Sequence, residues 1–269
     1  MKIKIILSIA LISALLLTAC SETQVRSVPE SDIDLSEVDY IVGLPSYSHY
    51  GDAQRLTEAA DVVVIGEIVD ISFQVLDMTT GLPPTEITLD VDRRLTTIYD
   101  IEVITSLKGD VAGVIQMKID GGIKDYRVEE QLRISREMNA WWKDSIVLIE
   151  YSPELKIGET YLLALCDLTL RGFETPLLVY MIPQQSVFNL KNPFSKQSLS
   201  GRYDGRVGDY SKDIDLEDSP LISAYDIVSV FGDDVWDEFW QEWQRDNPDW
   251  ETRIDRAAVE DLLAKRELR

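Results

Sequence analysis

The sequence predicts a mainly β fold with appended helices, in the α+β class: a small antiparallel barrel or sandwich followed by a C-terminal helical region. Apolar runs of strand length recur between about residues 60 and 190, and turns that contain Gly and Pro separate them. In several of these runs apolar and polar residues alternate, which is typical of a half-buried strand. Beyond residue 203 the apolar residues instead recur at spacings of three and four, as on one face of a helix.

The first 19 residues predict an export signal. Lys2 and Lys4 precede an apolar run, 5–17, that is shorter than the ~20 residues a membrane-spanning helix needs. The segment ends in LTAC, residues 17–20, which resembles the lipobox of bacterial lipoproteins. The resemblance implies that the Cys20 thiol receives a diacylglyceryl group, that the chain is cut just before Cys20, and that the new amino terminus is often acylated too, for instance with palmitate. An uncleaved membrane anchor with a chance cysteine is the alternative.

The lipobox pattern predicts a location. We expect a protein of the cell membrane that is anchored by lipid on the extracytoplasmic face, because two acyl chains give a stable anchor where one is marginal. Residues 20–48 are polar and contain Pro29 and Pro45, so they are expected to form a flexible tether for the folded part. The other cysteine, Cys166, lies in an apolar run and is expected to be a small core residue with no role in a disulfide framework.

The charge of the chain restricts its partners. The whole sequence has 26 basic and 48 acidic residues; without Lys2 and Lys4 of the signal, 24 basic and 48 acidic residues leave a formal charge of −24. Such a charge argues against nucleic acid as a partner, since binding to phosphates needs Lys and Arg. It also repels anionic headgroups, so the folded body is expected to stand off the bilayer on its tether. The simplest interpretation is that the acidity keeps the protein soluble.

Residues 49–203 are expected to form the β-domain. A short helix with Asp52 at its cap precedes a long strand, 61–76, in which Gly66 suits a bulge or bend. After a loop with Gly and Pro come two apolar runs, ITLDV and TTIYDIEVITSLKG, and the second alternates with the period of a strand. A helical insertion is expected near 126–142. The other expected strands are GVIQMKIDGG, IVLIEY, GETYLLALCDL, TPLLVYMI and SVFNL.

Several stretches of this domain resemble known β-domains. The series ADVVVIGEI, IYDIEVITSLKGD, GG and L-x-I-G-E-T-Y-L-L is similar to β-domains of uncharacterised bacterial lipoproteins, and to the OB-type barrel of netrin-like and metalloproteinase-inhibitor domains. The resemblance covers about residues 60–189 and implies an OB-like fold with little about function, because the matching residues are mostly structural. The amino-terminal cysteine ridge of those inhibitors is absent, so inhibition is not implied. The matching residues are Gly66, Lys108, Gly109, Gly121, Gly122, Gly158 and Tyr161.

Residues 204–269 are expected to form an acidic loop and then helices at 223–231, 234–245 and 255–266. Asp233 or Asp234 can cap the second helix. Its apolar residues share one broad face, which either binds a partner in a groove or docks on the chain's own barrel. The candidate partner-binding residues on that face are Trp236, Phe239, Trp240 and Trp243.

Little in the sequence points to catalysis. His49 is the one histidine, which removes Ser-His-Asp, Cys-His and His-based zinc arrangements from the barrel. No G-x-S-x-G, P-loop or H-E-x-x-H motif is present, and no cofactor is expected. The adjacent Trp141 and Trp142 point in different directions on any regular element, so one is expected in the core and the other partly exposed, in a candidate ligand groove.

The weak metal candidate is an acidic run with carboxylates at alternating positions, which could hold calcium. A solvated loop is the better interpretation, because the loop glycine and the final Glu of an EF-hand are missing. The residues concerned are Asp213, Asp215 and Asp218.

Three hypotheses of function remain open. The first is a membrane-anchored, non-catalytic module that binds a protein, peptide or glycan at the envelope. The second is an envelope enzyme that uses carboxylates, which predicts a deep cleft lined by two or more acids with raised pKa values. The third is a structural subunit of an envelope complex. A binding module predicts instead a shallow apolar or aromatic patch.

Overall fold

The computed structural model describes residues 38–43, 50, 52–149, 152–171, 178–180, 186–195, 222–254, 256–257 and 259–260. They all belong to one compact unit, Leu35–Arg269. The predicted signal, the lipid site, His49, the calcium candidates and most of the predicted tether lie outside the described residues. The tether prediction, 20–48, was wrong for its part Tyr40–Gly43, which forms a strand that pairs with Ile146–Ile149.

The mainly β, α+β fold class is confirmed. A six-stranded sheet has the order β2-β3-β4-β7-β6-β8, and a separate two-stranded sheet joins β1 to β5. Because β2 also pairs with β6, the pairings of the five strands β2, β3, β4, β7 and β6 return to β2 and form a ring. The strands are β1 (Tyr40–Gly43), β2 (Val62–Asp77), β3 (Arg93–Lys108), β4 (Val114–Asp120), β5 (Ile146–Ile149), β6 (Thr160–Asp167), β7 (Leu178–Tyr180) and β8 (Val187–Asn189).

The predicted antiparallel barrel or sandwich needs one correction, because not all of its strand pairs are antiparallel. β4 and β7 pair in parallel, through Met117 and Leu178, and β1 pairs with β5 in parallel as well. Antiparallel pairing holds for the other partners, and β2 with β3 is the longest ladder. β6 is buried on both faces, as predicted, and Cys166 within it is 4% exposed.

Gly66 lies where the long strand β2 changes register against β3, as the bulge prediction requires. A Cβ atom at this position would lie 2.5 Å from Cγ2 of Ile101 and 2.9 Å from the carbonyl oxygen of Glu102. Only the absence of a side chain allows β3 to approach so closely.

We therefore expect Gly66→Ala to destabilise the protein by about 1–3 kcal/mol, because backbone as well as side-chain atoms must move to admit the methyl group. Urea unfolding measures the change. Val69→Ala, at a partly exposed position of the same strand, is the control and should change stability much less. Equal stability of Gly66→Ala and the wild type would contradict the close approach.

The helices lie close to the predicted positions, but the capping of one of them differs from the prediction. Asp52 caps the first helix, since its Oδ1 accepts a hydrogen bond from the Arg55 amide at 2.8 Å. The second C-terminal helix is capped by Gly232 without a side-chain bond, so capping by Asp233 or Asp234 was wrong; both acids lie in its first turn, where they favour the helix dipole. Most of the predicted helix 255–266 lies outside the described residues. The α-helices are α2 (Ala53–Ala59), α3 (Val128–Glu137), α5 (Ala224–Val230), α6 (Asp233–Asp246) and α7 (Trp250–Arg253).

The helical insertion is shorter than the predicted 126–142. It starts at Val128 because Arg127 takes a left-handed conformation with φ of 46°, and it ends at Glu137, two residues before Asn139 turns left-handed with φ of 49°. Within the described residues, no helix is both long and apolar enough to cross a membrane.

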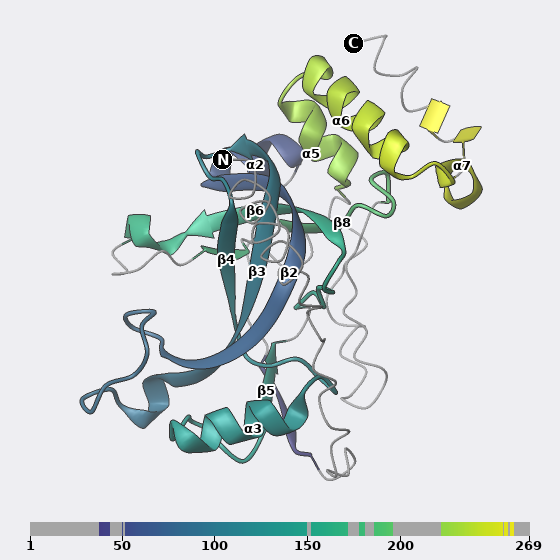
Figure 1. Cartoon of the computed structure of the whole chain (residues 1–269). Coiled ribbons are helices and arrows are strands. Elements are labelled where there is room, and N and C mark those ends of the chain that lie inside the picture. Colours follow the sequence, from purple (N-terminus) through teal and green to yellow (C-terminus); the bar gives the residue numbers. More distant parts are fainter. Residues whose placement is uncertain are drawn as a thin grey trace, which may run out of the picture. The chain divides into compact units, whose positions relative to one another are not determined.

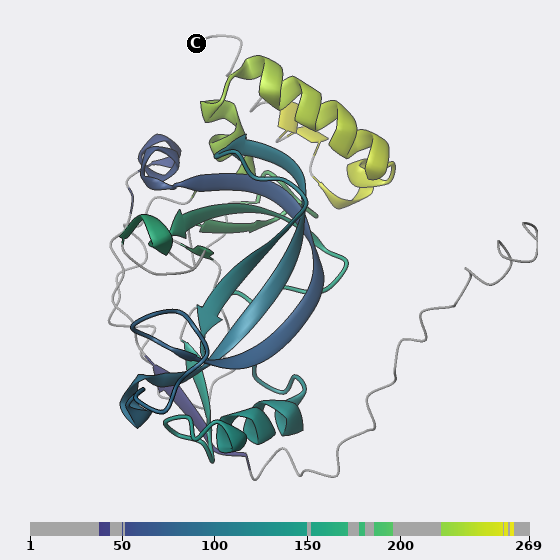
Figure 2. The same ribbon diagram turned by 60° about the vertical axis from the view of Figure 1, so that its left-hand side comes forward.

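The helices α2, α5 and α6 cover one end of the sheet (Figures 1 and 2). Their apolar faces join a hydrophobic cluster with residues of β2, β6 and β8, among them Ile65, Leu162 and Phe188. At the other end of β2, the strand continues into its connection with β3, next to α3 and β5 (Figure 2).

A candidate interaction surface at the β2–β3 hairpin end

We use the term hairpin end for two neighbouring connections: residues 78–92, between β2 and β3, and residues 138–145, between α3 and β5. Twelve large apolar side chains are markedly exposed in the described part of the chain, and seven of them lie on these two connections. Ile87 is the extreme case, at 90% exposed. The seven are Met78, Ile87, Leu89, Val91, Met138, Trp141 and Trp142.

Asp77, the last residue of β2, organises the first connection. Its Oδ1 accepts hydrogen bonds from the amide and the hydroxyl of Thr79, at 2.8 and 2.6 Å, and its Oδ2 accepts one from the hydroxyl of Thr88 at 2.7 Å. The side-chain hydrogen bond from Thr79 is the main cause of a lowered pKa for Asp77, although burial opposes it. A buried carboxylate therefore fixes the loop that presents Ile87 and Leu89.

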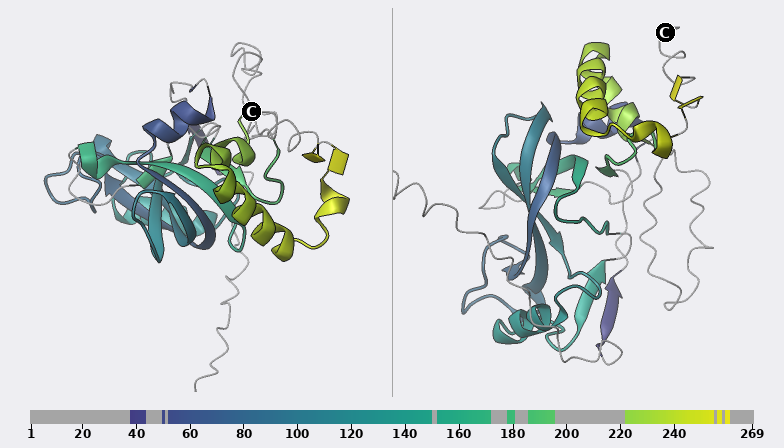
Figure 3. Two further views of the ribbon diagram at one scale, coloured as in Figure 1. Left: turned by 90° about the horizontal axis from the view of Figure 1, so that it is seen from above. Right: turned by 45° about the vertical axis from the view of Figure 1, so that its right-hand side comes forward.

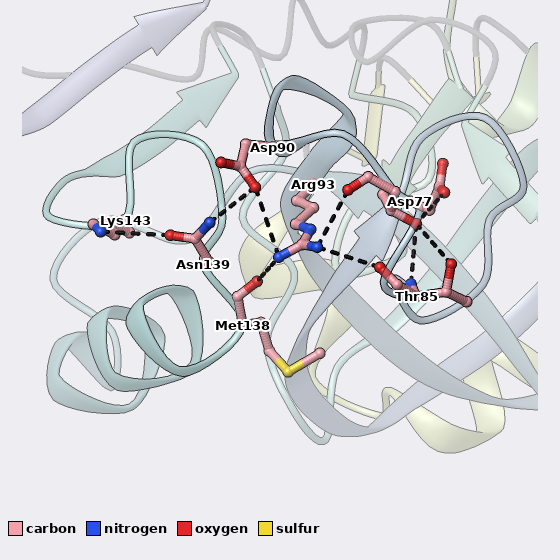
Figure 4. Close-up of polar contacts among 8 residues, drawn as sticks. Asp77, Thr85, Asp90, Arg93, Met138, Asn139 and Lys143 are labelled. Atoms are coloured by element: carbon pink, nitrogen blue, oxygen red, sulfur yellow. Dashed lines mark hydrogen bonds and ion pairs between the residues drawn. The ribbon is translucent and has the colours of Figure 1, made fainter.

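Arg93 joins the two connections (Figure 4). Its Nη2 donates to the carbonyl oxygens of Thr85 and Thr88, both at 3.2 Å, and its Nη1 donates to that of Met138, also at 3.2 Å. Asn139 adds a second link, because its Nδ2 donates to Oδ1 of Asp90 at 2.8 Å. Hydrogen bonds thus hold together the two loops that carry the exposed apolar residues.

Trp141 and Trp142 stack on each other, with ring centroids 5.0 Å apart and an angle of 26° between the rings. They are 42% and 46% exposed, so the prediction that one of them lies in the core was wrong. Adjacent side chains diverge on a regular element, but Trp142 has a φ of 61°, and this left-handed turn lets both rings share one side. The guanidinium of Arg94 lies 4.3 Å from the Trp141 centroid and adds a cation–π contact.

The carboxylate of Asp77 makes the loop sensitive to acid. Its folded-state pKa is depressed, so its contribution to stability is complete above the usual Asp pKa of about 3.9 and is lost as the pH falls through the folded value. We expect Asp77→Asn to cost about 1–3 kcal/mol at neutral pH, because an amide nitrogen cannot accept one set of these hydrogen bonds.

The difference between Asp77→Asn and the wild type should shrink as the pH falls below about 4. Urea unfolding at a series of pH values measures it. Asp110→Asn, at an exposed aspartate, is the control and should follow the wild type throughout. A difference that is constant with pH would show that the ionised carboxylate does not hold the loop.

A hollow with a volume of about 320 Å³ lies between the sheet and α6. Ile65, Phe239 and Trp243 are among its apolar walls, and Glu159 and Lys191 form an ion pair in its polar wall. Burial acts to raise the pKa of Glu159, but hydrogen bonds from Lys191, Tyr161 and Asn189 outweigh it and lower the pKa. The lowered pKa of Glu159 is opposite to the raised pKa that the enzyme hypothesis predicts for an acid in a cleft.

The structure places the four aromatic candidates of α6 against the chain's own sheet. Trp236 is fully buried, Trp240 and Trp243 are nearly so, and Phe239 packs beside them. The indole nitrogen of Trp243 donates to the carbonyl oxygen of Leu190 at 2.6 Å. Of the two alternatives for this face, docking on the barrel is the arrangement present, and a partner could reach the face only after α6 left the sheet.

Sequence reasoning singled out the tryptophan pair of the hairpin end but missed its aliphatic residues. A signal existed in ITLDV, which follows two prolines and has apolar residues at alternate positions. The structure places Leu89 and Val91 of this run, 65% and 49% exposed, next to or within a short 3-10 turn, Asp90–Asp92.

In comparisons with known proteins, no family model matches the chain and no curated protein matches it. In the described ranges, no group of three or more His, Cys, Asp or Glu side chains is placed to hold a metal ion. The hairpin end and the lipobox pattern are therefore the features of this chain that bear on its function.

Proposed function

We propose that this protein is an extracytoplasmic lipoprotein, held at the cell membrane by lipid on Cys20, and that it acts there as a non-catalytic interaction module. The lipobox pattern of residues 17–20 supports the anchor. The hairpin end supports the interaction.

The observation that carries the proposal is the exposure of seven large apolar side chains on two connected loops. Burial of such a side chain contributes about 1.5–3 kcal/mol, so leaving seven in water is unfavourable unless a partner covers them. Single exposed apolar residues are common on protein surfaces, but a group that includes two stacked tryptophans is not.

The support below these side chains also favours binding. Asp77 and Arg93 hold the loops in one conformation through hydrogen bonds to Thr79, Thr85 and Thr88. A surface that is already ordered loses little conformational entropy when a partner docks. The residues of the hairpin end therefore form a surface that is pre-organised for binding.

The carboxylate enzyme is the second candidate, and the hollow beside α6 is the place where it would act. Glu159 is the most enclosed acid there, with a side chain 16% exposed. Its lowered pKa keeps the carboxylate ionised, and three hydrogen-bond donors already contact its oxygens. These properties suit a structural ion pair better than a general acid. The interaction module is therefore preferred.

Site-specific photocrosslinking tests the proposal in cells that express the full chain. A photoreactive amino acid replaces Trp142 in one variant and Val114, which is 59% exposed on β4, in the control. We expect adducts to protein, glycan or lipid at position 142 and few at position 114. Equal yields at the two positions, in folded protein, would contradict an interaction surface at the hairpin end.

A further inference from the structure

We infer that the hairpin end docks at the headgroup interface of the lipid bilayer, so that the anchored protein contacts the membrane through the hairpin end. The inference deepens the proposed function and rests on its lipid anchor. Its first support is the place where the chain enters the fold.

The described chain begins beside the second connection of the hairpin end. The carbonyl oxygen of Asp39 accepts a hydrogen bond from the amide of Ile146 at 2.9 Å, and its carboxylate accepts one from the hydroxyl of Ser145, also at 2.9 Å. Ser145 is three residues beyond Trp142 in the second connection of the hairpin end. β1 then continues along β5, as the right-hand view of Figure 3 shows.

The segment that leads to the lipid therefore starts at the hairpin end. Seventeen residues, 21–37, separate Cys20 from Val38, and they span roughly 60 Å at full extension. A tether of this length allows many parts of the protein surface to reach the membrane. The part next to the point where the tether joins the folded domain has the highest effective concentration at the membrane.

The side chains of the hairpin end suit the bilayer interface. Tryptophan is favoured at the headgroup level because its ring is amphipathic, and both Trp141 and Trp142 are exposed here. Ile87 and Leu89 add aliphatic groups that project from a loop, 90% and 65% exposed. Transfer of such groups from water to hydrocarbon is favourable.

The local charge of the hairpin end permits contact with the bilayer, although the protein as a whole is strongly acidic. The hairpin end has one basic and four acidic residues, a formal charge of −3; with the flanking residues 93–94 and 136–137 it has four basic and five acidic residues, a charge of −1, against −24 for the chain from residue 20 onward. Charges beyond about 8 Å are largely screened at physiological ionic strength, so the local balance decides the contact with headgroups. The stand-off expected from net charge therefore does not apply to this end.

Docking on this surface leaves the hollow beside α6 in the aqueous phase. Ile65, which lines that hollow, and Asp77, below the exposed loop, are twelve residues apart on β2. At about 3.3 Å per residue, this separation is roughly 40 Å along the strand.

A fluorescent probe tests the inference in the lipid-anchored full chain, reconstituted in phosphatidylcholine vesicles with and without phosphatidylglycerol. An environment-sensitive dye is attached to Ile87→Cys, or to Val114→Cys as the control; the native Cys166 is buried. We expect emission at position 87 to shift to shorter wavelength and to be quenched several-fold more by brominated lipid than emission at position 114. Adding Trp141→Ser and Trp142→Ser should weaken the quenching at position 87, while circular dichroism checks the fold.

Emission typical of water at both positions would overturn the inference. Shielding of position 87 that grows with protein density, without lipid quenching, would also overturn it and would assign the surface to a second copy of the chain. In either case adducts at position 142 in the photocrosslinking experiment would keep the proposed interaction surface, whereas their absence would remove it.

Discussion

Truncation of the chain after Gly232 is expected to unfold or aggregate the protein. The truncation removes three tryptophans of α6 that are at most 9% exposed and pack with residues of β2, β6 and β8. At about 1.5–3 kcal/mol for each buried side chain, their loss is comparable with the 5–15 kcal/mol that stabilises a typical domain. Thermal melting measures the effect, and an unchanged melting temperature would show that α6 contributes nothing to the fold.

Single substitutions separate packing from hydrogen bonding in the same helix. Trp236→Ala should cost about 3–5 kcal/mol, and Glu238→Ala, on the exposed face, should cost little. Trp236→Phe should be milder than Trp243→Phe by about 1 kcal/mol, because the indole nitrogen of Trp236 has no hydrogen-bond partner among the described residues and that of Trp243 donates to Leu190. The reverse order would contradict the assigned role of the Trp243 hydrogen bond.

Cys20→Ala is expected to abolish processing and lipid attachment, and to leave a precursor that keeps residues 1–19. Each buried CH₂ of an acyl chain contributes about 0.8 kcal/mol, so two chains account for stable membrane association and a chain without them lacks that contribution. Labelling with radioactive palmitate should mark the wild type and leave the variant unmarked.

Cys166→Ala is the matched control, since this cysteine is buried in β6. It should retain the palmitate label on Cys20. Label that persists in Cys20→Ala would contradict the role of Cys20.

The parts of the fold that could be predicted are those determined by local pattern. Alternating residues and continuous apolar runs located the long strands, and Gly66 marked a bulge because no other residue fits against Ile101 there. Asp52 indicated the start of α2, because its side chain can cap a helix. These signals act over a few residues, so the sequence contains them directly.

The hairpin end could not be predicted in the same way, because tertiary contacts determine it. Arg93 joins segments whose residues, Thr85 and Met138, are 53 positions apart in the sequence. The left-handed conformation of Trp142, which brings both indole rings to one side, has no local signature, since tryptophan rarely adopts it. Helical spacing likewise identified the aromatic face of α6 and left its docking partner open.

The most direct test of the central claim, a lipid-anchored module at the membrane, is the intact mass of the mature protein purified from membranes. Our account predicts an amino-terminal residue Cys20 that carries the added mass of a diacylglyceryl group. A mature chain that begins upstream of Cys20, with a free thiol at that residue, would contradict it.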